Sequence, residues 1–231
     1  GDKIQTAPSI LDINGDKVIL AGTGEDSGQG QDNNLYAINA DGTLRFTVKA
    51  NKDIMTSASF LSHNGKQYIF FGSNDSLIYA VDENGDALSG WPVDAGVSIS
   101  KSVLFSDLDC NGDPEVIAST TETDFVAYNI NGTPYAGFPM SGSSRFTSSP
   151  AIVDLDNDGD LEILSGSQDE LVVIDIKSVG SDTSYWNMYR GNLRRTGYSG
   201  TSPIGGYIAE CPEQLKTTTP YLSHEYKLNP L

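Results

Sequence analysis

Two acidic loops contain the residues whose types and spacing are best suited to binding a metal ion. Residues 154–162 read DLDNDGDLE, and residues 107–115 read DLDCNGDPE. In each loop, alternate residues bring oxygen atoms to one centre, a glycine at the sixth position allows a sharp turn, and a glutamate stands ninth. About six or seven hard oxygen ligands at this spacing suit Ca²⁺, whereas Mg²⁺ prefers fewer protein ligands.

Each loop therefore predicts a calcium site. The predicted ligands are Asp154, Asp156, Asp158, Asp160 and Glu162 in one loop, and Asp107, Asp109, Asn111, Asp113 and Glu115 in the other. The seventh residue of each loop would contribute its backbone carbonyl oxygen. Without a cation the clustered carboxylates would repel one another, which favours metal binding over the alternative of a solvated acidic turn. Neither loop is an EF-hand, because Ser165 or Ala118 stands where an EF-hand needs an acid.

The rest of the sequence contains no pattern that is typical of a catalytic site. It has no nucleophile elbow and no glycine-rich phosphate loop, and its two histidines, His63 and His224, lie far apart. The 14 Lys and Arg residues against 31 Asp and Glu residues give a net charge of −17, which repels nucleic acids and anionic membranes. We therefore expect no catalytic residues, no enzyme activity and no nucleic-acid partner. No apolar run approaches the ~20 residues of a spanning helix, so we expect no transmembrane segment.

The acidic loops are part of a fourfold internal repeat. Each repeat begins with small hydroxylated residues and continues into an apolar strand, a polar turn and a second apolar strand. The turn glycines, 50, 47 and 47 residues apart, are Gly15, Gly65, Gly112 and Gly159. A third strand follows in each repeat, and the segments GWPV and GFPM mark a fourth. Because Asn-Gly and Asp-Gly pairs favour tight hairpins, each repeat is expected to form a four-stranded antiparallel meander.

Four strands per repeat of about 45 residues are typical of a β-propeller blade. We predict an all-β fold, a β-propeller with four recognisable four-stranded antiparallel blades and an extended Pro-rich tail or linker. The predicted blades cover about residues 4–50, 54–96, 98–142 and 145–198, and the tail covers residues 199–231. A β-sandwich does not explain the period, and solenoid coils are shorter. The repeats leave open whether four blades close a ring or further blades lie upstream.

Three further expectations follow from the repeat. The chain starts at a blade boundary without an initiator methionine or a signal peptide, so we expect a piece of a longer precursor. Trp91, Phe138 and Trp186 recur at corresponding blade positions and are predicted to pack between blades. The turns of the first two repeats are shorter and poorer in acids, and no calcium site is predicted there.

The stretch TSSPAIVDLDNDGDLEILSGS, together with GWPV and GFPM, resembles FG-GAP/VCBS-type propeller repeats, which occur in integrin α heads and in many secreted bacterial proteins. The resemblance spans about residues 4–198 and implies calcium-binding hairpins in which the ninth loop residue closes the shell. The segment YWNMYRGNLRRTGY resembles the stretch that often closes such arrays in bacterial surface proteins and secreted peptidases. The terminal YLSHEYKLNPL resembles the junction before type IX secretion sorting domains.

The resemblance implies a secreted or cell-surface protein. We expect a non-catalytic, calcium-binding extracellular module that mediates protein–protein interaction, adhesion or assembly, with an extracellular protein or another copy of itself as partner. One alternative is a C-terminal accessory domain of a secreted peptidase or other hydrolase. Another is a lectin that binds glycans. Because propellers host many functions, the fold does not choose between these.

The two cysteines are too few for a disulfide scaffold or a structural zinc site. Cys110 lies inside an acidic loop and Cys211 lies in the tail. Because a secreted protein matures in an oxidising environment, we predict a Cys110–Cys211 disulfide that ties the tail to the third blade. Two unrelated thiols are the alternative.

Overall fold

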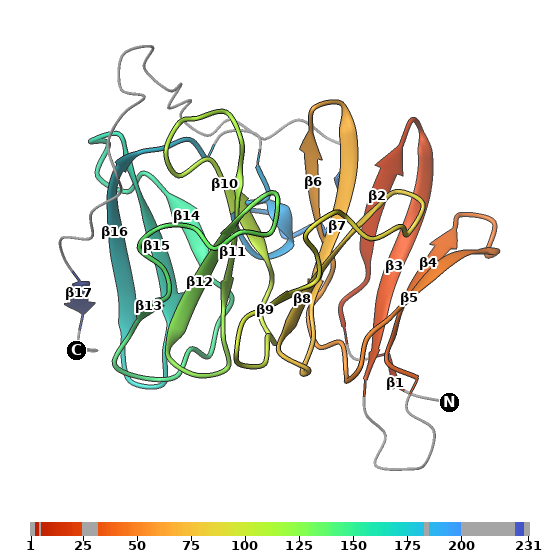
Figure 1. Ribbon diagram of the computed structural model, residues 1–231, viewed down its shortest axis with the longest axis horizontal. Helices are drawn as coiled ribbons and strands as arrows, with labels where there is room; N and C mark the ends of the chain where they lie inside the picture. The colour runs from red at the N-terminus through yellow and green to blue at the C-terminus, as the bar shows by residue number, and fades with distance from the viewer. Residues whose placement is uncertain (1–2, 5, 25–31, 183–184, 200–224, 229–231) are drawn as a thin grey trace.

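The computed structural model describes residues 3–4, 6–24, 32–182, 185–199 and the backbone of 225–228. Its strands form four antiparallel sheets, which we number as blades 1 to 4 in chain order. Blade 1 contains β1 (Lys3–Ile4), β2 (Ser9–Ile13), β3 (Asp16–Gly24), β4 (Asn34–Asn39) and β5 (Leu44–Lys49). Blade 2 contains β6 (Ser59–His63), β7 (Lys66–Gly72), β8 (Leu77–Asp82) and β9 (Val93–Asp94). The blades lie side by side along the molecule, with blades 1 and 4 at its two ends (Figure 1).

Blade 3 contains β10 (Leu104–Ser106), β11 (Glu115–Ser119), β12 (Asp124–Asn129) and β13 (Met140–Ser141). Blade 4 contains β14 (Ala151–Val153), β15 (Asp160–Gly166), β16 (Leu171–Val179) and β17 (Glu225–Leu228). Blades 2 to 4 are four-stranded meanders, in which each strand pairs with the next one along the chain. The predicted all-β fold with four antiparallel blades is thus confirmed. The fourth strand of blade 4 comes from the segment expected to be a linker, where no strand pattern had indicated it.

The hairpin turns adopt the backbone that the Asn-Gly pairs predict. In blade 1, Asn14 and Gly15 have φ angles of 55° and 96°, and in blade 2, Asn64 and Gly65 have φ angles of 50° and 73°. Positive φ at both central residues defines the type I′ turn, whose twist matches that of the strands it joins. Blades 3 and 4 have longer loops at this place, and these are the two acidic loops.

The small hydroxylated residues at the start of the repeats bind the second strand. The hydroxyl oxygens of Thr6, Thr56 and Ser148 each accept the N–H of a glycine, Gly22, Gly72 and Gly166 respectively, at 2.8 Å. At Gly72 a side chain would not fit, because a Cβ there would lie 2.2 Å from Cγ2 of Ile99. The repeated hydroxyl–glycine pair therefore lets the chain that leads into the next blade pack closely on β7.

Aromatic rings pack between neighbouring blades. Phe70 of β7 meets Phe105 of β10, with ring centroids 4.9 Å apart. Trp91 packs edge-on against Phe70 at 5.1 Å and against Tyr128 of β12 at 6.2 Å. Its indole N–H donates to the carbonyl oxygen of Ile130 at 2.9 Å. The prediction that Trp91 belongs to the inter-blade core is confirmed.

Residues 181–182 and 185–199, which we name the closing segment, contact the first strand of each repeat, namely β2, β6, β10 and β14. The segment includes the short helix η1 (Tyr189–Gly191). Ser181 exchanges two backbone hydrogen bonds with Asp107, and the N–H of Ile152 in β14 donates to the Asn187 carbonyl oxygen at 2.9 Å. The N–H of Ile10 in β2 donates to the carbonyl oxygen of Gly197 at 2.6 Å.

Trp186 lies within the closing segment, not at the blade position of Trp91. Its carbonyl oxygen accepts the N–H of Phe105, and its ring packs edge-on against Phe60 of β6 at 5.1 Å. With these contacts the closing segment touches all four blades, so it ties the first blade to the fourth. The sequence pattern missed this role because the partners of Trp186 lie far away in the chain.

Candidate metal centre

The two acidic loops have the same local construction. In blade 3 the carboxylate of Asp107 accepts the N–H of Gly112 at 2.9 Å, and in blade 4 the carboxylate of Asp154 accepts the N–H of Gly159 at 3.2 Å. Both glycines have φ angles above 90°. The first aspartate therefore folds each loop back on itself, which requires the glycine at the sixth position.

The ninth residue closes each loop. Glu115 accepts the N–H of Leu108 at 2.7 Å, and Glu162 accepts the N–H of Leu155 at 2.6 Å. Glu115 is the first residue of β11, and Glu162 is the third residue of β15. The hairpin register therefore places each side chain beneath its loop. The ninth residue therefore holds the second residue of the loop in both copies, and its predicted role as the last ligand of a calcium ion stays a prediction.

Three carboxylates converge in each loop. One oxygen each of Asp107, Asp109 and Glu115 lies within 4.8 Å of the others, and the same holds for Asp154, Asp156 and Glu162. These two groups could hold a metal ion, and their all-oxygen composition is compatible with Ca²⁺. They contain six of the ten residues predicted as ligands.

Burial makes the glutamates costly to ionise unless a cation is near. Glu115 is 1% exposed, and burial, with further repulsion from Asp109 and Asp107, raises its pKa to about 9. Glu162 is 4% exposed, and burial, with repulsion from Asp156 and Asp175, raises its pKa to about 7. A bound cation would reverse both effects, because it stabilises the charged form of each group. The donor set therefore fits a hard divalent cation.

A buried hydroxyl of blade 3 lies within electrostatic reach of the acidic loop. Tyr135 is 5% exposed, and its hydroxyl has no hydrogen-bond partner in the described part of the chain. Burial and the negative charges of Glu115, Asp109 and Asp107 raise its pKa. A buried hydroxyl without a hydrogen-bond partner is uncommon, and the charges of the acidic loop act on this one. The sequence analysis missed Tyr135, because it lies 20 residues after Glu115.

The other predicted ligands make contacts of their own. The side-chain oxygen of Asn111 accepts the N–H of Asp113 at 2.7 Å. The carboxylate of Asp113 points outward and meets His63 of blade 2 at 3.0 Å. The role predicted for Asp113 uses its backbone carbonyl oxygen, so this side-chain contact does not conflict with it.

Lys177 of β16 approaches the blade 4 loop, another contact that the sequence did not indicate. Its ammonium lies 3.7 Å from a carboxylate oxygen of Asp158 and 3.4 Å from one of Asp160, and it also contacts Asp175. Burial, with repulsion from Asp158, raises the pKa of Asp160 to about 6. In blade 3 the strand partner of Glu115 is Asn129, whereas in blade 4 the strand partner of Glu162 is Asp175. The blade 3 loop therefore has no counterpart of the Lys177–Asp175 ion pair.

In the corresponding turn of blade 1, the carboxylate of Asp12 is paired with groups of the protein. It binds Lys17 at 2.8 Å and accepts a hydrogen bond from the hydroxyl of Tyr198 at 2.8 Å.

Cys110, inside the blade 3 loop, is 5% exposed and is not a free thiol. Its predicted partner Cys211 lies outside the described residues, so the pairing stays a prediction.

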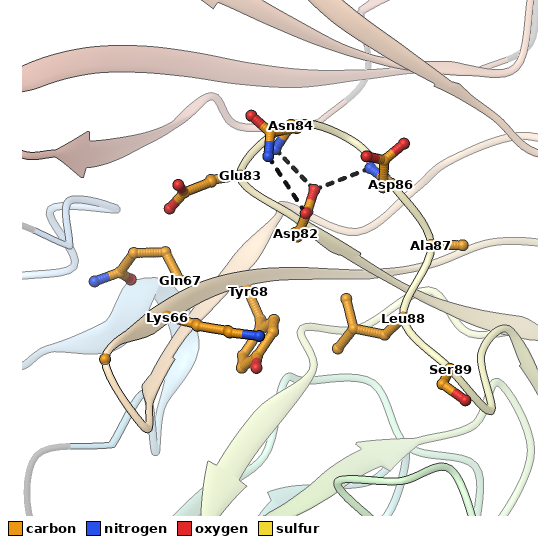
Figure 2. Close-up of a pocket in the computed structure, with 11 residues that line it drawn as sticks. Lys66, Gln67, Tyr68, Asp82, Glu83, Asn84, Asp86, Ala87, Leu88 and Ser89 are labelled. Carbon is orange, nitrogen blue, oxygen red and sulfur yellow. Dashed lines mark hydrogen bonds between the residues drawn. The ribbon is translucent and has the colours of Figure 1, made fainter.

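A polar depression of about 500 Å³ lies on blade 2. It is lined by residues 65–68, 82–84 and 86–89. Figure 2 shows Asp82 holding the turn above it, where its carboxylate accepts the N–H groups of Asn84 and Asp86 at 2.8 and 3.0 Å. Tyr68 and Leu88 supply apolar surface, and Lys66 is an exposed cation at its margin.

Comparisons with known proteins agree with this architecture. Residues 107–165, which contain both acidic loops, match the family model of the FG-GAP-like repeat. Residues 11–95 match that of the lambda-carrageenase beta-propeller domain. Together with the four sheets, these matches define the class. The chain is a β-propeller protein with FG-GAP-type repeats, as the sequence resemblance indicated.

Two curated relatives are lambda-carrageenases. The one from Pseudoalteromonas carrageenovora is 32% identical over 98 residues, which are 42% of this chain and 10% of the relative. The one from Pseudoalteromonas sp is 33% identical over 79 residues, which are 34% of this chain and 8% of the relative. The chain therefore spans about a tenth or less of the length of these relatives.

A solved structure also overlaps with this chain. It is a crystal structure of a protein of unknown function from Bacteroides caccae, with 18% identity and a TM-score of 0.46 over 78% of this chain and 59% of that one. Among the described residues, no helix is long and apolar enough to cross a membrane.

Proposed function

We propose that the two acidic loops bind Ca²⁺ and that the ion stabilises blades 3 and 4. The observation that carries this proposal is the buried glutamate repeated in both loops, Glu115 and Glu162, each beside two aspartates. Nearly complete burial of a carboxylate among other carboxylates is unfavourable, and a divalent cation offsets it. Asp107, Asp109 and Glu115 would hold one ion, and Asp154, Asp156 and Glu162 the other.

The module acts by binding other proteins and not by catalysis, and it acts outside the cell. Extracellular calcium concentrations saturate modules with dissociation constants of about 10⁻⁴–10⁻³ M, so an ion can be a permanent structural part there. The paired carboxylates that an acid–base mechanism would need are the same ones that would hold the metal ion. The partners are extracellular proteins, including other copies of this chain.

Calcium-dependent stability tests this proposal. The protein is freed of metal with a chelator, and its melting temperature is followed while calcium is added, with magnesium in parallel. A ligand at a hundredfold excess over its Kd stabilises the folded state by about 2.7 kcal/mol per site. We expect calcium to raise the melting temperature and elemental analysis of the untreated protein to find calcium. An unchanged melting curve and no bound metal would refute the proposal.

A matched pair of variants locates the effect. Asp154→Ala removes a carboxylate of the blade 4 loop and is expected to abolish about half of the calcium-dependent gain. Asp41→Ala removes an exposed aspartate from a turn of blade 1, where the described contacts of its carboxylate are with Thr43. This control is expected to keep the full response to calcium.

A second candidate is a carbohydrate-binding accessory domain of a secreted hydrolase. The match of residues 11–95 to the lambda-carrageenase propeller domain favours it, because that range contains the depression on blade 2. Titration calorimetry with carrageenan oligosaccharides tests this candidate. Lys66→Ala is expected to weaken binding, whereas Lys52→Ala, an exposed lysine outside the depression, leaves it unchanged. The absence of any binding heat excludes this candidate for these sugars.

A further inference from the structure

The two acidic loops are joined by a pair of adjacent residues, Gly180 and Ser181, which we name the link. The N–H of Ser181 donates to the carbonyl oxygen of Asp107, the first residue of the blade 3 loop, at 2.7 Å, and its carbonyl oxygen accepts the N–H of Asp107 at 2.9 Å. The N–H of Gly180 donates to the carbonyl oxygen of Gly159, the sixth residue of the blade 4 loop, at 3.2 Å. Two consecutive residues therefore hold the backbones of both loops.

The link lies close against both loops. A Cβ atom on Gly180 would lie 2.9 Å from the carbonyl oxygen of Asp107 and 2.7 Å from Cδ1 of Leu161, the eighth residue of the blade 4 loop. Leu161 is 0% exposed, and Gly180 is buried as well. A side chain at position 180 would therefore push the link away from the loops, and the glycine allows the close approach.

The residues that the link holds are ones on which each candidate site depends. Asp107 is one of the three acids that converge in blade 3. Gly159 forms the turn of the blade 4 loop, where its N–H binds the carboxylate of Asp154. An ion that fixes Asp107 would also fix Ser181, and through Gly180 it would fix the turn that positions Asp154.

We infer that Gly180 and Ser181 couple the two acidic loops, so that calcium bound in one loop raises the calcium affinity of the other. This inference rests on the proposed function, because it concerns the regulation of the same two sites. Without an ion the carboxylates of each loop repel one another, so each loop becomes ordered when it binds calcium. A loop whose backbone is already held by its occupied neighbour loses less conformational entropy, which favours the second binding step.

Direct electrostatics opposes this coupling. The blade 3 loop carries four carboxylates and the blade 4 loop carries five, and an ion in one loop cancels part of the negative charge that attracts the second ion. Salt screens this effect, over a Debye length of about 8 Å at physiological ionic strength, and leaves the hydrogen bonds and packing of the link in place. The measured coupling is therefore expected to increase as salt is added.

Calcium titrations of single-site variants measure the coupling on the full 231-residue chain. Asp109→Ala removes a carboxylate of the blade 3 site, and Asp156→Ala removes one of the blade 4 site. If the sites are independent, the product of the two association constants of the unaltered chain equals the product of the constants of the two remaining single sites. We expect it to be larger by about fivefold or more, a typical coupling factor.

A glycine substitution tests whether the link carries the coupling. The same titrations are repeated with Gly180→Ala added to each chain, and the excess of about fivefold is expected to disappear. Gly24→Ala is the matched control in blade 1, because a Cβ atom there would lie no closer than 3.3 Å to its neighbours. This control is expected to keep the full coupling, and melting curves verify that each variant is folded.

Hydrogen exchange gives a second readout that does not depend on the folding of Gly180→Ala. In Asp156→Ala, calcium binds only the blade 3 loop, whereas the Gly180 amide donates its hydrogen bond to the blade 4 loop. Calcium is nevertheless expected to slow the exchange of this amide about fivefold, because the link transmits the order of one loop to the other. In Asp109→Ala, the Ser181 amide, which donates to Asp107, is expected to respond in the same way.

Three results would overturn the inference. These are a product of constants equal to that of the single sites at every salt concentration, a coupling that Gly180→Ala leaves unchanged, and a coupling that decreases as salt is added. Two loops that bind calcium independently refute the coupling alone and leave the proposed function intact. Loops that bind no calcium refute both, so the two failures are distinguishable.

Discussion

The buried glutamate of the blade 3 loop leads to a prediction in which one substitution has opposite effects with and without calcium. Glu115 has a pKa of about 9 in the folded chain and 4.5 in the unfolded chain. Between these two values the folded state holds a proton that the unfolded state releases. Each pH unit above 4.5 therefore lowers the free energy of unfolding of the metal-free protein by about 1.4 kcal/mol, until the folded group also ionises near pH 9.

At pH 7 this loss amounts to about 3 kcal/mol, a large part of a typical domain stability. Glu115→Gln removes the ionisation but keeps the size of the side chain and an oxygen for the N–H of Leu108. We therefore expect the metal-free variant to be more stable than the unaltered protein by up to about 3 kcal/mol at pH 7, and by less than about 1 kcal/mol at pH 5. With saturating calcium the order reverses, because the variant has lost a metal ligand.

Urea denaturation at pH 5 and pH 7, in chelator and in calcium, measures both effects. Glu122→Gln serves as the control, because Glu122 is an exposed partner of Arg145 and such pairs contribute about 0–1 kcal/mol. The reasoning is refuted if metal-free Glu115→Gln is less stable than the unaltered protein at pH 7. That result would mean that hydrogen bonds within the protein stabilise the ionised carboxylate of Glu115 without a cation.

Two further predictions concern Lys177 and the cysteines. Lys177→Met should raise the calcium affinity of the blade 4 loop about tenfold, because the ammonium beside Asp158 and Asp160 competes with the ion; calorimetric titration measures this, and an unchanged or lower affinity contradicts it. Reduction of the Cys110–Cys211 disulfide should lower the melting temperature, because the bond closes a loop of about a hundred residues and contributes up to about 4.7 kcal/mol. Peptide mapping without reductant identifies the bond, and two freely alkylated cysteines would disprove it.

The acidic loops could be predicted from the sequence because their geometry is local. The interval of eight residues between Asp107 and Glu115, with a glycine between them, sets which side chains share the inside of the loop. The hairpin turns are local in the same way, since Asn14 and Gly15 need only their own φ angles to reverse the chain. A repeat of about 47 residues then multiplies each local motif, which makes the blade visible in the sequence.

Only the tertiary structure shows the contacts between residues that are far apart in the chain. Nothing in the spacing of Lys177 shows that it contacts an acidic loop, and Trp186 looks like Trp91 until its partner Phe60 is known. The exposure of Ile19 is equally hidden, because Ile19 stands at the same place in its repeat as the buried Ile69. Identical periods encode identical strands, but burial depends on whether a neighbouring blade lies against them, and that is a property of the assembled array.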